Sequence, residues 1–208
     1  TGDDLVFQSS NGTGTGGSGD IRFQTAPGGQ SVTYDTSTSS ATGTSTLTSI
    51  SWSHTVADQP NRMLLVGVVT GNTTVSSVSY GSQAMTQVRT DISGTSVRTT
   101  LFYLANPDVG TNTITVVTAA VTNIVGTSAS YYGVDPTIGS DAGSNQAATT
   151  TYTGATVTSA AGELVVDIVG ITSTTATWTP GANQSAYYGT TGSDSNANSA
   201  NISTEAGA

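Results

Sequence analysis

The stretch RMLLVGVVT, residues 62–70, decides the fold. From Met63 to Val69 every residue except Gly67 is apolar, so the run lacks the polar alternation of a strand with one solvated face. It predicts a strand that is buried on both faces or lies at the centre of a sandwich. A second apolar segment, ELVVDIVGIT at 163–172, predicts another central strand of the same core.

Shorter strand-like segments surround these two runs. TNTITVVTA (111–119) has a period of two, and VSSVSYGSQAMTQVRT (75–90) reads as two strands around a hairpin turn at Tyr80–Gln83. Turn residues such as Asn106-Pro107 and Pro180-Gly181 separate further strands. About nine strands with regular turn signals predict an all-β fold. We expect an antiparallel β-sandwich, jelly-roll or Ig-like, with an extended N-terminal strand segment.

The composition excludes several classes of partner. The 208 residues include 41 Thr and 28 Ser, and the net charge is −9 with four Arg and no Lys. Nucleic acids and anionic membranes both attract basic surfaces, so neither partner is expected. No apolar run reaches the roughly 18 residues of a membrane span. A chain that is rich in Thr and lacks Lys and Cys is typical of secreted and cell-surface bacterial proteins, which is the location we expect.

The N-terminus carries a tandem repeat. DLVFQ at 4–8 and DIRFQ at 20–24 are two similar strand-like segments, separated by the Gly-rich stretch NGTGTGGSG at 11–19. We expect residues 1–30 to form a strand motif with a flexible Gly-rich tether. Residues 31–46 are expected to be a low-complexity linker or a strand, and residues 47–208 the sandwich domain.

The region from Trp52 to Gly181 resembles a β-sandwich domain of large secreted and surface-anchored bacterial proteins. The sequence segments that carry this resemblance are SWSHT (51–55), NRMLLVGV (61–68), VSYGSQAMT (78–86), FYLANP (102–107), GTNTITV (110–116) and GVD (133–135). Residues 1–30 resemble the Gly-rich repeats of phage-tail and adhesin stalks. The family has no assigned catalytic residues, so the resemblance implies a fold and no chemistry. It also implies a further apolar strand at the end of the domain. The tail TTGSDSNANSANISTEAGA (190–208) has only Ile202 as a sizeable apolar residue, so we expect that closing strand to be missing or to lie beyond Ala208.

A sandwich that lacks its last strand, in a chain with two additional strand-like segments, predicts assembly by strand donation. An open sheet edge invites another chain, and an inserted strand gains main-chain hydrogen bonds along its length. Leu5 and Phe7 share one face of the first word, as Ile21 and Phe23 do in the second, so these four are the expected donor-strand anchors. We predict a structural subunit of an extracellular filament or surface appendage, a head-to-tail homopolymer. The alternative is an adhesin or phage-fibre module that binds surface glycans.

We expect no enzyme activity, no cofactor and no metal. His54, the one histidine, lies near no nucleophile-elbow motif and is expected to be structural. Asp20 follows a Gly-rich word that resembles a calcium-binding repeat, but that word occurs once. Asp135 and Asp141 are also possible calcium ligands, although their stretch suits an Asx-turn loop better.

Paired tyrosines offer a possible ligand site. Tyr131-Tyr132 and Tyr187-Tyr188, together with Trp178, could stack on a sugar, but packing in the core is the favoured interpretation. Tyr187 and Tyr188 are the candidate binding residues if the adhesin alternative holds.

Overall fold

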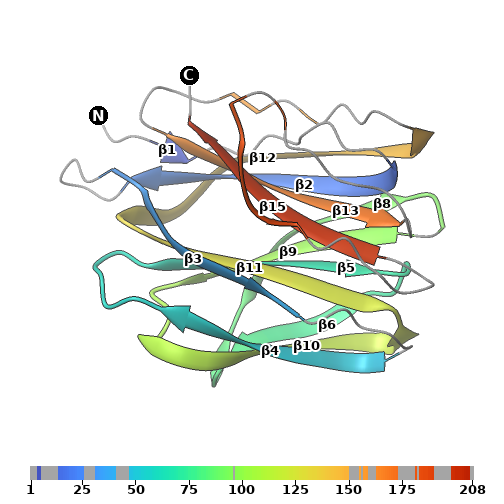
Figure 1. Cartoon of the computed structure of the whole chain (residues 1–208), viewed down its shortest axis with the longest axis horizontal. Helices are drawn as coiled ribbons and strands as arrows, with labels where there is room; N and C mark the ends of the chain where they lie inside the picture. The colour runs from blue at the N-terminus through green and yellow to red at the C-terminus, as the bar shows by residue number, and fades with distance from the viewer. Residues whose placement is uncertain are drawn as a thin grey trace.

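The structure is a computed structural model that describes residues 4–5, 14–25, 31–40, 47–95, 97–149, 155, 157–158, 163–172, 181, 183–189 and 198–206. The described residues form three antiparallel sheets stacked as layers (Figure 1). The predicted all-β antiparallel sandwich is therefore confirmed, and the structure adds a third sheet to it. None of the described segments is a helix long and apolar enough to cross a membrane.

The middle sheet contains the segment that decides the fold. Its strand order is β3 (Thr33–Ser39), β11 (Ile124–Tyr132), β5 (Met63–Thr70), β9 (Val97–Ala105) and β8 (Thr86–Ser93). All eight residues of the central strand β5 are buried. Met63 and Leu65 belong to the core on one side of the sheet, and Leu64, Val66 and Val68 belong to the core on the other side. The prediction of a strand buried on both faces is confirmed.

The lower sheet in Figure 1 packs on one face of the middle sheet. Its order is β4 (Leu47–Val56), β10 (Gly110–Thr122), β6 (Val75–Tyr80) and β7 (Gln83–Ala84). The expected turn at Tyr80–Gln83 is present, because Tyr80 pairs with Gln83 and Gly81 between them has a positive φ of 56°. Glycine adopts this backbone conformation without steric cost. The returning strand of this hairpin is short, Gln83–Ala84, and Thr86–Ser93 continues as β8 of the middle sheet.

The upper sheet packs on the opposite face and brings the two ends of the chain together (Figure 1). Its order is β1 (Asp4–Leu5), β2 (Gly14–Thr25), β13 (Leu164–Thr172), β15 (Asn198–Ala206) and β14 (Ser185–Gly189), and β12 (Val134–Thr149) also pairs with β2. This sheet supplies Val165, Val166, Ile168 and Ile202 to the core. The segment predicted as a central strand is thus central to the upper sheet.

The prediction of a flexible Gly-rich tether is wrong for residues 14–19. These residues are part of β2, where Gly17 has Gly170 of β13 as one Cα partner and Asn145 of β12 as the other. Main-chain hydrogen bonds hold a strand whatever its side chains are, and glycine lets neighbouring backbones approach closely. Residues 11–13 lie outside the described part of the chain.

The prediction of a missing closing strand is also wrong. β15 lies between β13 and β14, and Ala200 and Ile202 are fully buried in it. The polar residues Asn201, Ser203 and Thr204 are buried as well. Ser203 donates a hydrogen bond to Asp167, and the Asn201 amide donates to the Val169 carbonyl. Polar residues can fill a central strand when their hydrogen bonds are satisfied, so a count of apolar residues failed to reveal it.

Two further segments form strands although they are poor in apolar residues. Residues 135–141, for which an Asx-turn loop is the favoured interpretation of the sequence, are part of strand β12, although register shifts interrupt the pairing there. In the stretch 31–46, expected to be a linker or a strand, Thr33–Ser39 is strand β3 of the middle sheet. Both segments are rich in small polar residues, so their composition does not distinguish a strand from a loop.

Candidate functional site

His54 lies on the inner face of β4, between the lower and the middle sheets. It alternates along the strand with Trp52 and Val56, and all three are buried. Opposite them lie Ser128 and Ser130 of β11, which are fully buried, and Thr38 of β3. A period of two along β4 therefore directs His54 into a hydroxyl-lined part of an otherwise apolar interface.

A continuous set of hydrogen bonds joins these residues. His54 Nδ1 lies 2.8 Å from Thr38 Oγ1 and 3.0 Å from Ser128 Oγ, and His54 Nε2 lies 3.0 Å from Ser130 Oγ. Ser130 donates to Asp35 Oδ2 over 2.7 Å, and the Trp52 indole donates to Ser128 Oγ over 3.1 Å. We call this set, running from Trp52 to Asp35, the hydroxyl chain. It connects β4 of one sheet to β3 and β11 of the next.

The hydroxyl chain fixes the position of the imidazole proton. A carboxylate only accepts hydrogen bonds, so Ser130 gives its proton to Asp35 and must accept from His54 Nε2–H. Nδ1 then carries no proton and accepts from Thr38 or Ser128. The neutral tautomer with hydrogen on Nε2 satisfies both ring nitrogens.

Burial keeps this imidazole neutral. Desolvation lowers the pKa of His54 from its ordinary value of 6.5 to about 4, against a smaller opposing effect of the Asp35 charge. His54 is 1% exposed, so the unfavourable transfer of a charged ring from water decides the direction of the pKa shift. At neutral pH the residue is a hydrogen-bonding spacer between two sheets.

The hydroxyl chain is not a catalytic triad. In a triad the carboxylate orients the histidine, and the histidine contacts the nucleophile. Here Ser130 lies between His54 and Asp35, so the carboxylate holds the hydroxyl and not the imidazole. Ser128, Ser130 and His54 are buried, Thr38 is half-buried, and the side-chain hydrogen-bond partners of the imidazole in this cluster are hydroxyls, so no carboxylate orients the ring. The geometry suits a structural connection between sheets.

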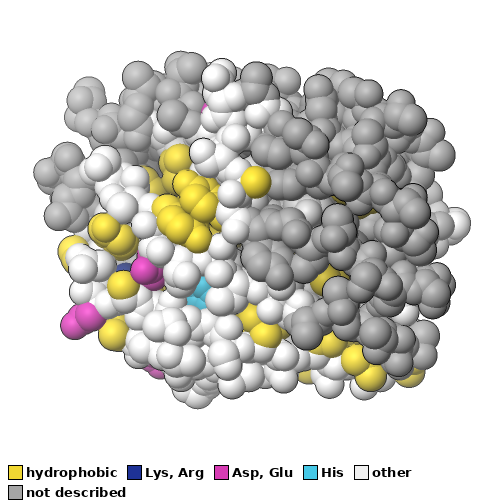
Figure 2. Space-filling view, viewed as in Figure 1, with side chains coloured by type: hydrophobic (Ala, Val, Ile, Leu, Met, Phe, Trp, Pro, Cys, Tyr) yellow, Lys and Arg dark blue, Asp and Glu magenta, His cyan; other side chains and the backbone are white. Residues whose placement is uncertain are grey.

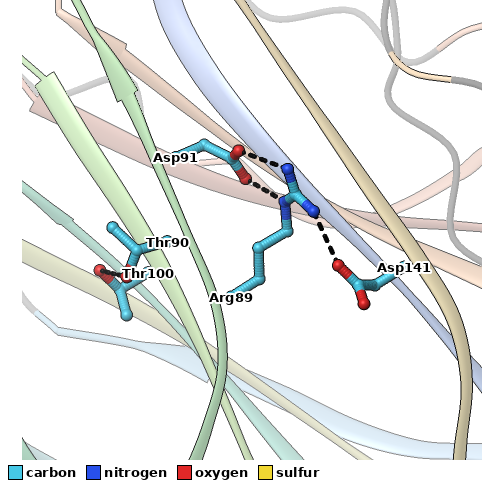
Figure 3. A network of polar contacts seen from close by, with 5 residues as sticks. All are labelled: Arg89, Thr90, Asp91, Thr100 and Asp141. Carbon is cyan, nitrogen blue, oxygen red and sulfur yellow. Dashed lines mark hydrogen bonds and ion pairs between the residues drawn. The ribbon is translucent and has the colours of Figure 1, made fainter.

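A second polar cluster joins the middle sheet to the upper sheet (Figure 3). Arg89 of β8 makes two parallel hydrogen bonds to Asp91, of 2.7 and 2.9 Å, and a third of 2.7 Å to Asp141 of β12. These bonds raise the pKa of Arg89, with the Asp91 contact contributing most. Gly143 of β12 lies against the pair, since a Cβ there would come within 2.3 Å of Asp91 Oδ2. Asp141 therefore serves an ion pair, and a calcium role for it is not needed.

Three tyrosines cluster where β3, β11 and β14 meet. The rings of Tyr34 and Tyr187 stack with centroids 3.9 Å apart, and Tyr131 meets Tyr34 edge-on at 6.0 Å. Tyr131 is buried, and desolvation raises its pKa well above the ordinary value. Tyr187, a candidate ligand residue, is half-buried and uses one ring face against Tyr34.

The remaining predicted site residues have only their backbone described, or lie outside the described chain. Leu5 is in β1, Ile21 and Phe23 are in β2, and Tyr188 is in β14. Phe7 and Trp178 lie outside the described residues. On the face shown in Figure 2 the described surface is mostly uncharged, with a few separate acidic side chains and some clustered hydrophobic ones.

The sequence interpretation missed the partners of His54. Thr38, Ser128 and Ser130 are ordinary residues in a chain with so many hydroxyls, and Asp35 stands in a low-complexity stretch. One signal was present: TSAS at 127–130 places small polar residues in the middle of a strand-like segment. Comparison of the chain with protein-family models, with curated proteins and with solved structures gives no match in any of the three.

Proposed function

We propose that this chain is a structural subunit of an extracellular filament or surface appendage, joined head to tail by exchange of its first strand. The observation that carries the proposal is the strand register between the two repeated segments, DLVFQ and DIRFQ. Asp4 has Gln24 as its Cα partner and Leu5 has Phe23, so Asp4–Leu5 of the first segment runs antiparallel to Phe23 and Gln24 of the second within one sheet. The first repeated segment thus supplies a strand, and the second supplies the residues with which that strand pairs.

The same register is available between two chains. If β1 leaves its own β2 and pairs with β2 of a neighbour, the contacts are identical and only the chain entropy differs. Exchange in one direction leaves a free strand at one end of each oligomer and a free edge at the other end. A contact of this heterologous kind does not close, so it extends into a fibre.

This form of the proposal differs from donation into a missing last strand. β15 occupies that position, so the acceptor we propose is the edge of β2 that β1 covers. Ile21 and Phe23 then stay in their own subunit as part of β2, and Leu5 and Phe7 are the residues that pass to the neighbour.

A non-catalytic role and a location outside the cell belong to the same proposal. The hydroxyl chain supports the first, because the carboxylate of Asp35 holds Ser130 and does not orient the imidazole as a catalytic triad requires. The Lys-free, Cys-free composition and the resemblance of residues 52–181 to domains of bacterial surface proteins support the second. The adhesin alternative rests on Tyr187, which is half-buried on β14 and has one ring face covered by Tyr34.

Removal of residues 1–8 tests the proposal. A longer deletion of residues 1–25 would remove β2, which pairs with β12 and β13, and would disrupt the upper sheet. We expect the full chain to form linear oligomers that grow with concentration, measured by light scattering and electron microscopy. The 9–208 chain should remain monomeric with an unchanged β-type circular dichroism spectrum. Equal assembly of the two chains would contradict strand exchange.

A further inference from the structure

The outer face of the lower sheet carries an almost complete array of hydroxyl groups. Buried residues alternate with outward-facing ones along residues 51–56 of β4, 113–118 of β10 and 77–80 of β6, and the same alternation places Ser49 and Thr111 on the outer face. Nine of the ten outward positions before the register shift in β10 are Ser or Thr, and the tenth is Val117. We call this array the hydroxyl face: Ser49, Ser51, Ser53, Thr55, Ser77, Ser79, Thr111, Thr113, Thr115 and Val117.

The array is regular in two directions. β10 pairs with β4 without a shift from Gly110 to Val117, and with β6 from Ile114 to Val117. Thr115 has Ser51 on one side and Ser79 on the other, so the hydroxyls form rows across the strands. Neighbouring strands are about 4.8 Å apart, and every second residue along a strand repeats after about 6.8 Å.

The array is also held rigidly. Behind it the same strands bury Trp52, Ile114 and Val116 in the core between the lower and middle sheets. Trp52 packs against Gly126, where an added Cβ would lie 2.4 Å from the indole ring. Thr55 and Thr111 hydrogen-bond to each other at 2.7 Å on the outer face, and β-branched Thr has restricted χ1 rotation. A rigid surface loses little conformational entropy when it binds.

The chemistry of the hydroxyl face limits what can bind there. The chain has a net charge of −9, yet none of the ten positions is charged, so the complementary partner is neutral. None of them is aromatic, so the face lacks the rings that stack on sugars. Its one large apolar residue gives a second copy of the chain little apolar surface to bury. The fitting partner is a neutral lattice whose groups both donate and accept hydrogen bonds and repeat on the scale of a sheet.

We propose that the hydroxyl face binds the surface of ice. Each hydroxyl both donates and accepts a hydrogen bond, as a water molecule does, and the Thr methyl groups lie beside the hydroxyls. A single hydroxyl–water bond contributes little net free energy, because the same group is hydrated in solution. The rigid, repeated array lets many such contacts form together on an ordered water layer, where they halt the growth of the crystal.

The full chain tests the proposal by inhibition of ice recrystallisation, with thermal hysteresis as a second readout. Thr113 lies in the middle of the array, and Thr113→Tyr places a bulky ring there without touching the core. Thr86→Tyr is the matched control, since Thr86 is exposed on β8 of the middle sheet. We expect the unmodified chain and Thr86→Tyr to inhibit recrystallisation, and Thr113→Tyr to lose the effect.

Several results would overturn the proposal. One is an unmodified chain with no effect on ice growth, and another is equal activity of the two variants. Retention on insoluble cellulose that Thr113→Tyr abolishes, with no activity on ice, would assign the face to a glycan. A dimer that Thr113→Tyr dissociates would assign it to a second copy of the chain. The readout on ice does not depend on residues 1–8, so failure of strand exchange leaves it unaffected.

Discussion

At the scale of single residues, neutral His54 makes stability depend on pH. Its pKa is about 4 in the folded chain and 6.5 in the unfolded chain, so the unfolded state binds a proton first as the pH falls. The stability contributed by neutral His54 is complete above pH 6.5 and is lost progressively between 6.5 and 4. Between pH 7 and pH 4.5 the expected loss is about 2 kcal/mol of unfolding free energy.

His54→Gln separates this effect from the titration of the carboxylates. Glutamine can hydrogen-bond to the hydroxyls but does not titrate, so its unfolding free energy should fall less over the same range. Urea unfolding of both proteins at pH 7 and pH 4.5 measures the difference. If the two lose the same amount of stability, His54 does not sit neutral in the hydroxyl chain.

The Arg89 cluster gives a second prediction at this scale. Asp91 is buried beside Arg89, whereas Asp141 is more exposed. Arg89→Met leaves the buried Asp91 carboxylate without its cation and should cost roughly 3–5 kcal/mol. Asp141→Asn removes a partly exposed ion pair and should cost less than about 1 kcal/mol. Chemical unfolding of the two variants checks this ranking, and an Asp141→Asn variant as unstable as Arg89→Met would contradict it.

The sequence could predict that His54 is structural, but not which residues hold it. His54 meets Ser128 and Ser130 because β4 packs across β11 from a different sheet, and these residues are more than 70 positions apart in sequence. Local spacing carries no information about such a contact. The same holds for Arg89 and Asp141, whose strands belong to separate sheets.

At the scale of strands, β15 is the element whose presence differs most from what the sequence predicted, because a closing strand was expected to be missing. It covers the edge of β13 along nine residue pairs, from Leu164 to Thr172. A chain truncated after residue 197 should expose that edge and bind a synthetic peptide of residues 198–208, which restores its thermal stability. A peptide carrying Ile202→Asp is the matched control, because it places a charge in the core. A truncated chain that stays folded and ignores both peptides would contradict the assignment of β15.

The contrast between β5 and β15 shows where sequence patterns predict strands. Met63–Val69 is apolar except for Gly67, and burial on both faces needs that pattern, so β5 was predictable. β15 also buries Asn201, Ser203 and Thr204, and the hydrogen bonds of Asn201 and Ser203 are made to residues of β13. The prediction also failed for the Gly-rich part of β2, because glycine contributes to a sheet through its backbone alone.

At the scale of the whole molecule, three stacked sheets leave the two ends of the chain in one layer. The upper sheet contains both β1 and β15: β1 lies beside β2, and β15 lies beside β13 and β14. The described start of the first repeat, Asp4–Leu5, pairs with the second repeat. The all-β class was predictable from the strand spacing, whereas the third sheet was not, because the Gly-rich part of β2 was interpreted as a tether and the segment of β15 as a tail without its closing strand.

A disulfide between positions 5 and 23 tests strand exchange most directly. The chain has no cysteine, so in Leu5→Cys/Phe23→Cys every disulfide uses positions 5 and 23 alone, and the single variants, which pair only like positions, give the background of dimers. The protein is oxidised at high and at low concentration, and then unfolded in detergent without reductant. Strand exchange predicts a ladder of covalent multimers from the concentrated sample and monomers from the dilute one. Monomers with an internal disulfide at every concentration would contradict it.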